Sequence, residues 1–91
     1  MQHVNLKDAE IIFKTLAEIL REEREKQGKS QRLLADEFAL QHSMISRLEK
    51  GLNEPRFISL WSLAEALGMK LSDLIKLVED RLPAGFSLLD L

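Results

Sequence analysis

The chain has 91 residues, no cysteine, 45% hydrophobic residues and a formal net charge of −2. A chain of this length forms one small domain, and without cysteine it has neither disulfides nor a thiolate zinc site. No apolar run approaches membrane-spanning length and the first residues do not resemble a signal peptide, so a cytoplasmic protein is expected.

The charges are unevenly distributed along the chain. A net negative charge is unusual for a protein that binds nucleic acid. However, residues 21–59 carry eight basic and seven acidic residues, which makes this third of the chain the net positive one. A nucleic-acid contact is therefore expected in this middle part, with modest non-specific affinity.

The first predicted helix begins near Leu6 and runs to about Gln27, where Gly28 stops it. Asn5 is placed to cap its start. Residues 1–14 are a predicted N-terminal helical extension, which either continues this helix or forms one of its own. The apolar residues of this extension either enlarge the core or form a dimer contact.

Two short amphipathic helices separated by a break are predicted over residues 30–51. Leu34, Ala35 and Phe38 share one face of the first, and Ile45 and Leu48 share one face of the second. Two helices joined by a short turn form a helix-turn-helix, whose second helix can lie in the major groove of DNA. The exposed face of that second helix carries side chains suited to base edges, namely Gln41, His42, Ser43 and Arg47.

A loop around Pro55 leads to a fourth predicted helix, from about Ser59 to Leu67, and Ser72 is predicted to open a fifth. Trp61 lies off the apolar stripe of the fourth helix. The chain then ends in an apolar tail over residues 81–91, which is expected to fold back on its own domain or onto a partner.

Several of these stretches, in register, resemble the lambda-repressor-like (Cro/XRE) helix-turn-helix family. They are Ser30-Gln31-Arg32-Leu33-Leu34-Ala35, Ile45-Ser46-Arg47-Leu48-Glu49-Lys50-Gly51, Pro55, and Leu60-Trp61-Ser62-Leu63-Ala64-Glu65-Ala66-Leu67-Gly68. The resemblance covers residues 15–80 and implies an all-α, compact bundle of about five helices with a central helix-turn-helix. The N-terminal helical extension (1–14) and the apolar C-terminal tail (81–91) are additions to this domain.

The resemblance implies a sequence-specific, DNA-binding transcriptional regulator that acts as a homodimer on a pseudo-palindromic operator, as a repressor or controller. The recognition helix would span about residues 41–50. The implied base readers are Gln41, His42, Ser43 and Arg47, and the implied phosphate contacts are Gln31, Arg32, Lys50, Asn53 and Arg56.

The resemblance also implies a structural ion pair between Arg24 and Glu49, which would fix the first helix against the recognition helix. Family members often pair through the fourth helix and the final helix. A dimer or partner interface is therefore expected at Trp61, Phe86, Leu88 and Leu89, and packing of Trp61 under the C-terminal tail is the alternative.

Two residues of the turn depart from the family's pattern. Ala39 stands where glycine is usual, at a position that favours positive φ, and Gln41 stands where Ser or Thr usually caps the recognition helix. A slightly remodelled or strained turn is expected.

An alternative function is the antitoxin component of a toxin–antitoxin pair, which would bind a protein toxin as well as its own promoter. The toxin would then contact the extension, Leu33, Trp61 and the tail. The expected partners are thus double-stranded DNA and a second copy of the chain, with a toxin under the alternative and no membrane.

Catalysis is not expected. His42, Ser43 and Ser46 are close in sequence, but no acidic residue is placed to orient the histidine. His3 and His42 are far apart and lack ligand spacing with any acidic residue, so neither a metal nor another cofactor is expected.

Overall fold

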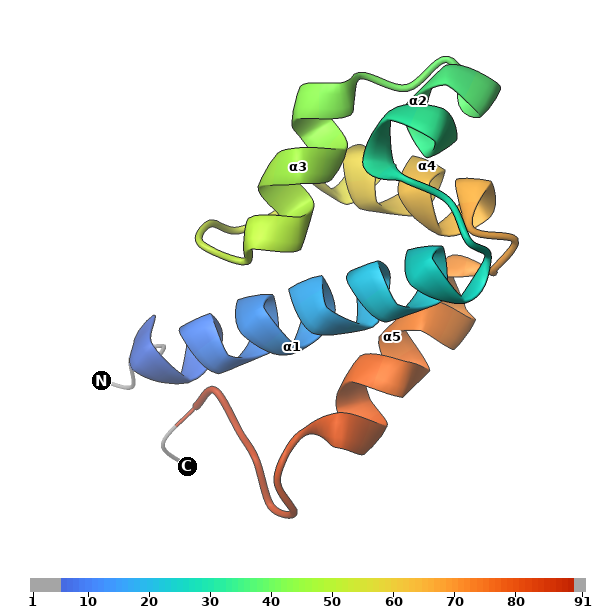
Figure 1. Ribbon diagram of the computed structural model, residues 1–91. Helices are drawn as coiled ribbons and strands as arrows, with labels where there is room; N and C mark the ends of the chain where they lie inside the picture. Colours follow the sequence, from blue (N-terminus) through green and yellow to red (C-terminus); the bar gives the residue numbers. More distant parts are fainter. Residues whose placement is uncertain (1–5, 90–91) are drawn as a thin grey trace.

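The computed structural model describes residues 6–89, which contain five α-helices. They are α1 (Leu6–Lys26), α2 (Gln31–Phe38), α3 (His42–Lys50), α4 (Phe57–Ala66) and α5 (Leu71–Arg81). Figure 1 shows α1 as the longest helix, with α2, α3 and α4 on one side of it and α5 on the other. The predicted all-α bundle is confirmed. In the described part of the chain, no helix has the length and apolar character needed to cross a membrane.

The N-terminal extension continues the first helix. α1 runs without a break for 21 residues and ends before Gly28, whose φ of 68° only glycine adopts freely. Of the two predicted arrangements, the structure therefore has the single helix. The predicted cap at Asn5 lies outside the described residues, and the division into segments 1–14, 15–80 and 81–91 stays a prediction.

One hydrophobic core holds all five helices together. Its side chains recur at three- and four-residue spacing, so each helix turns one apolar face inward. The largest fully buried side chains come from every helix: Ile19 and Leu20 of α1, Leu34 of α2, Ile45 of α3, Leu63 of α4 and Leu74 of α5. Each stabilises the fold by about 1.5–3 kcal/mol through removal of apolar surface from water. This core fixes α3 with its polar face outward.

The turn between α2 and α3 contains a strained residue. Ala39, which ends α2, has φ 53° and ψ 38°, the left-handed conformation predicted for it. Gln41 is the N-cap residue of α3, but its side chain makes no capping hydrogen bond there. By contrast, Ser30 caps α2 by accepting a hydrogen bond from the Leu33 amide at 3.0 Å. Within residues 6–89, Ala39 is the one non-glycine residue with a positive φ, so the backbone strain of this part of the chain lies in the turn between α2 and α3.

Replacing Ala39 with Gly is expected to stabilise the protein by up to about 1 kcal/mol. Relief of the left-handed alanine contributes roughly 1–2 kcal/mol, and the greater freedom of glycine in the unfolded chain offsets part of it. Urea denaturation followed by circular dichroism measures this gain. Gly28→Ala, which introduces the same strain at φ 68° in open space, is the matched control and should change stability in the opposite direction. A loss of stability in Ala39→Gly would contradict the strain argument.

The last two helices begin earlier than predicted. α4 starts at Phe57 rather than Ser59, and α5 starts at Leu71 with Lys70 as its N-cap residue. The prediction that Ser72 opens α5 was therefore wrong. The side chain of Leu71 packs against the core, and its burial starts the helix one residue before the serine.

The described part of the tail turns back toward the N-terminal end of α1 (Figure 1). Leu82 packs against the core, and a turn follows in which the Phe86 amide donates to the Pro83 carbonyl at 3.0 Å. Phe86 and Leu88 are half-buried, while Leu89 is 44% exposed. The tail thus folds back beside its own domain.

Candidate nucleic-acid interface

The polar face of α3 is open to solvent. Ile45 and Leu48 are buried in the core, and the opposite face of the helix lies outward. The four predicted base readers, Gln41, His42, Ser43 and Arg47, are all exposed. Met44 and Ser46 flank them and are half-buried. The fold therefore presents one helix face with amide, imidazole, hydroxyl and guanidinium groups free for hydrogen bonding.

The predicted phosphate contacts come from two segments. Arg32 of α2 is exposed, as are Lys50, Asn53 and Arg56 at the end of α3 and in the loop after it. Gln31 differs, because its amide Nε2 donates to Glu49 Oε1 at 3.1 Å and the side chain is half-buried. That bond uses one of its two amide hydrogens, so the other is left for an anion.

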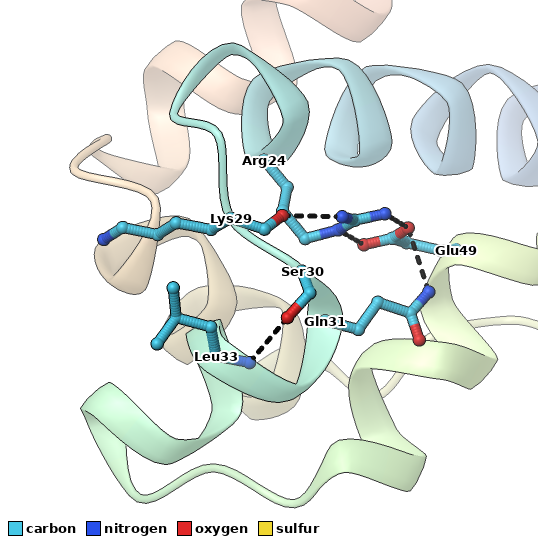
Figure 2. A network of polar contacts seen from close by, with 6 residues as sticks. All are labelled: Arg24, Lys29, Ser30, Gln31, Leu33 and Glu49. Carbon is cyan, nitrogen blue, oxygen red and sulfur yellow. Dashed lines mark hydrogen bonds and ion pairs between the residues drawn. The ribbon is translucent and has the colours of Figure 1, made fainter.

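A buried ion pair joins α1 to α3, at the positions where the resemblance implied it (Figure 2). Arg24 donates from Nε to Glu49 Oε2 and from Nη2 to Glu49 Oε1, both at 2.8 Å. Its remaining nitrogen, Nη1, donates to the Lys29 carbonyl at 2.8 Å. The side chains of Arg24 and Glu49 are 13% and 4% exposed.

This network links four parts of the fold. Arg24 belongs to α1, Lys29 to the turn after it, Gln31 to α2 and Glu49 to α3, as Figure 2 shows. Hydrogen bonds with the Glu49 carboxylate raise the pKa of Arg24 above its ordinary value, so the guanidinium stays charged. Two charged hydrogen bonds in a fixed geometry resist rotation of α3 about its own axis. The network thus orients the exposed face.

A small hollow of about 130 Å³ lies between α3 and the loop that follows it. It brings together Arg47, Asn53 and Arg56, three of the predicted DNA-contacting residues, with Glu54 beside them. Ser59 also lines it, a polar residue that the sequence did not single out because it was assigned to the start of α4. The two guanidinium groups make this hollow attractive to an anion, and the carboxylate of Glu54 opposes that attraction.

The exposed face of α4 is apolar. Trp61 is 44% exposed, its Nε1 donates to Glu65 Oε2 at 3.0 Å, and its ring meets that of Phe57 edge-on at 5.6 Å. Phe57 and Ile58 beside it are 61% and 72% exposed. The sequence analysis did not single out these two, because the fourth helix was predicted to begin only at about Ser59. Trp61 also lines a groove between α4 and α5, and none of its described lining residues comes from the tail.

No cluster of three or more His, Cys, Asp and Glu side chains with metal-binding geometry occurs within residues 6–89. Of the two histidines, His42 is exposed at the start of α3, and His3 lies outside the described residues.

Comparisons with known proteins agree with the helix-turn-helix arrangement of α2 and α3. A helix-turn-helix family model, HTH_3, matches residues 20–74, more than half of the chain. The chain is similar to the solved structure of the clp gene regulator ClgR from C. glutamicum, with 26% identity and a TM-score of 0.67 over 80% of this chain and 95% of that one. The comparison with curated proteins gives no significant match.

A second similar structure is an HTH_3 family transcriptional regulator from Vibrio cholerae, with 22% identity and a TM-score of 0.66 over 87% of this chain. The match spans 45% of the length of the Vibrio protein. At this identity, the likeness shows the fold alone.

Proposed function

We propose that the chain, which belongs to the helix-turn-helix family HTH_3 and is a DNA-binding transcriptional regulator, acts as a homodimer. The homodimer would bind a pseudo-palindromic operator, as a repressor or controller. The observation that carries the proposal is the exposed polar face of α3, held in place by the Arg24–Glu49 pair. A single helix of this form fits the major groove of B-DNA.

The side chains of this face suit particular bases. The guanidinium of Arg47 can donate two hydrogen bonds to O6 and N7 of a guanine, and the amide of Gln41 can pair with N6 and N7 of an adenine. His42 and Ser43 can each donate or accept, so they add contacts without predicting a base. We assign base reading to these four residues and phosphate contacts to Gln31, Arg32, Lys50, Asn53 and Arg56.

The exposed apolar face of α4 supports the homodimer. One reading helix buries too little surface for high specificity, and a two-fold pair doubles its contacts. Phe57, Ile58 and Trp61 form an apolar surface of the kind that a second copy covers. The groove beside Trp61 carries both signs of charge, from Lys70, Glu65 and Glu79, so a two-fold arrangement can set lysine against glutamate. The tail residues Phe86, Leu88 and Leu89 stay a second predicted contact.

The alternative functions have less support. The family model and the similar ClgR structure, which is described as a clp gene regulator, support a transcriptional regulator, and the antitoxin function is not favoured. Members of the helix-turn-helix family typically bind DNA without catalysing a reaction.

Selection of random duplex DNA by the purified protein, with light scattering on the same sample, tests the proposal. The expected result is an enriched palindrome with half-sites about one helical turn apart, recovered by a dimer. No enrichment by a folded dimer, or an asymmetric site recovered by a monomer, would overturn it.

On the selected site, Arg47→Ala is expected to weaken binding by roughly 1–3 kcal/mol and to relax the sequence preference at one base pair. Lys50→Ala is the matched control, because it removes the same charge from the same helix at a predicted phosphate contact. It should weaken binding to all sequences about equally and lower the salt dependence. Affinities measured over a panel of single-base variants distinguish the two effects, and equal, small losses for both substitutions would mean that α3 is not the reading helix.

A further inference from the structure

We propose that Lys14, in the N-terminal half of α1, binds a DNA phosphate next to the one bound at Lys50. This inference rests on the proposed DNA-binding function and extends the interface to a part of α1 that precedes the matched family region, residues 20–74.

The backbone of α1 touches the end of the recognition helix at Lys14. A Cβ placed on Gly51, the residue that ends α3, would lie 3.2 Å from the Lys14 Cα, 3.0 Å from the Phe13 carbonyl oxygen and 2.9 Å from the Ala17 Cβ. Such distances are shorter than ordinary van der Waals contact, so the two backbones meet directly. The backbone of Lys14 therefore lies against Gly51, the residue that follows Lys50.

The two lysines are both exposed, and neither forms an ion pair with another residue of the described range 6–89. Like charges on neighbouring segments repel each other, and an anion near both offsets that repulsion. Acidic residues lie one turn away on either side of Lys14, at Glu10 and Glu18, and they reduce the positive potential without ion-pairing to it. A pair of free cations on adjoining backbones favours the closely spaced phosphates of a DNA strand.

The position of Lys14 on α1 is consistent with a phosphate contact next to that of Lys50. The Ala17 side chain and the backbone at Lys14 face Gly51. The side chains of Ile12, Phe13 and Leu16 line the apolar hollow toward α4 and α5. Lys14 is exposed on α1, and its Cα lies next to Gly51. In Figure 1, the loop after α3 lies over this half of α1. A DNA strand that follows the end of α3 therefore passes the Lys14 side chain.

The test is the salt dependence of binding to a mixed-sequence duplex, measured by fluorescence anisotropy for the wild type, Lys14→Ala, Lys14→Arg and Lys50→Ala. Each phosphate contact contributes about 0.9 to the slope of log affinity against log salt concentration. Lys14→Ala is expected to lower the slope by about 1 and to weaken binding about fivefold at ~0.1 M salt. Lys14→Arg should keep the wild-type slope, since it keeps the charge.

Lys76→Ala is the matched control, because Lys76 lies on α5, on the other side of α1, and the substitution makes the same change in net charge. An unchanged slope for Lys14→Ala, with a lowered slope for Lys50→Ala, would overturn this inference and leave the proposed function standing. Equal reductions for Lys14→Ala and Lys76→Ala would also overturn it, since they would reflect net charge alone. A wild type without salt-dependent binding would overturn the proposed function itself.

Discussion

Replacing Glu49 with Gln is expected to lower the free energy of unfolding by about 3 kcal/mol, a large part of the stability of a domain of this size. The substitution keeps the shape of the side chain but removes its charge. It leaves the Arg24 guanidinium charged, 13% exposed and without its carboxylate. The amide also turns a donor toward a group that can only donate. Urea denaturation monitored by circular dichroism measures the loss.

The chain contains a matched control for this substitution. Arg81 and Glu22 also form a bidentate pair, here through the two Nη atoms, with distances of 2.7 and 2.8 Å, but their side chains are 43% and 48% exposed. The hydrogen bonds from Arg81 lower the pKa of Glu22, so the contribution of this pair is present at neutral pH and is lost as the pH falls through that lowered value. Water solvates both groups when the pair is broken, so Glu22→Gln should have little effect on stability.

Equal losses of unfolding free energy for Glu49→Gln and Glu22→Gln would contradict the argument that burial makes the Arg24–Glu49 pair costly to break. A double variant, Arg24→Met with Glu49→Met, sharpens the comparison because it leaves no unpaired charge in the interior. It is expected to be more stable than Glu49→Gln alone.

The helices could be predicted from the sequence because their signals are local. Apolar residues at helical spacing, a serine cap at Ser30 and glycines at the helix ends identify each element without knowledge of its neighbours. The start of α5 was missed for the opposite reason. Leu71 joins the helix because its side chain packs against the core, and that contact depends on the whole fold.

The candidate site was predictable to a similar extent. Helical periodicity alone separates the outward face of α3 from Ile45 and Leu48. The Arg24–Glu49 contact spans 25 residues, and the resemblance to a family, rather than any spacing, placed the two together. The apolar face formed by Phe57 and Ile58 was not predicted, because it depends on where α4 begins. Nor could periodicity show that α1 meets the end of α3, since it gives the face of a helix and not its partner.

The close contact between α1 and Gly51 at the end of α3 predicts a large loss of stability in Gly51→Ala. The expected loss is about 2–4 kcal/mol, with a fall in Tm of roughly 10–30 °C. Two causes add. The left-handed φ of 66° strains any residue with a Cβ, and the new methyl group would lie 2.9 Å from the Ala17 Cβ and 3.0 Å from the Phe13 carbonyl oxygen. A backbone oxygen in a helix has little room to move, so α1 and α3 must separate. Thermal denaturation followed by circular dichroism measures the change.

Gly28→Ala distinguishes the two causes. Gly28 has nearly the same φ, 68°, but a Cβ there meets nothing within 4 Å, so the substitution should cost about 1 kcal/mol through backbone strain alone. The excess loss at Gly51 over Gly28 then measures the contact between α1 and the end of the recognition helix. Equal losses at the two glycines would mean that this contact yields easily. A large excess would mean that the N-terminal half of α1 is held rigidly beside α3, which is the placement that Lys14 requires to reach the same DNA strand as Lys50.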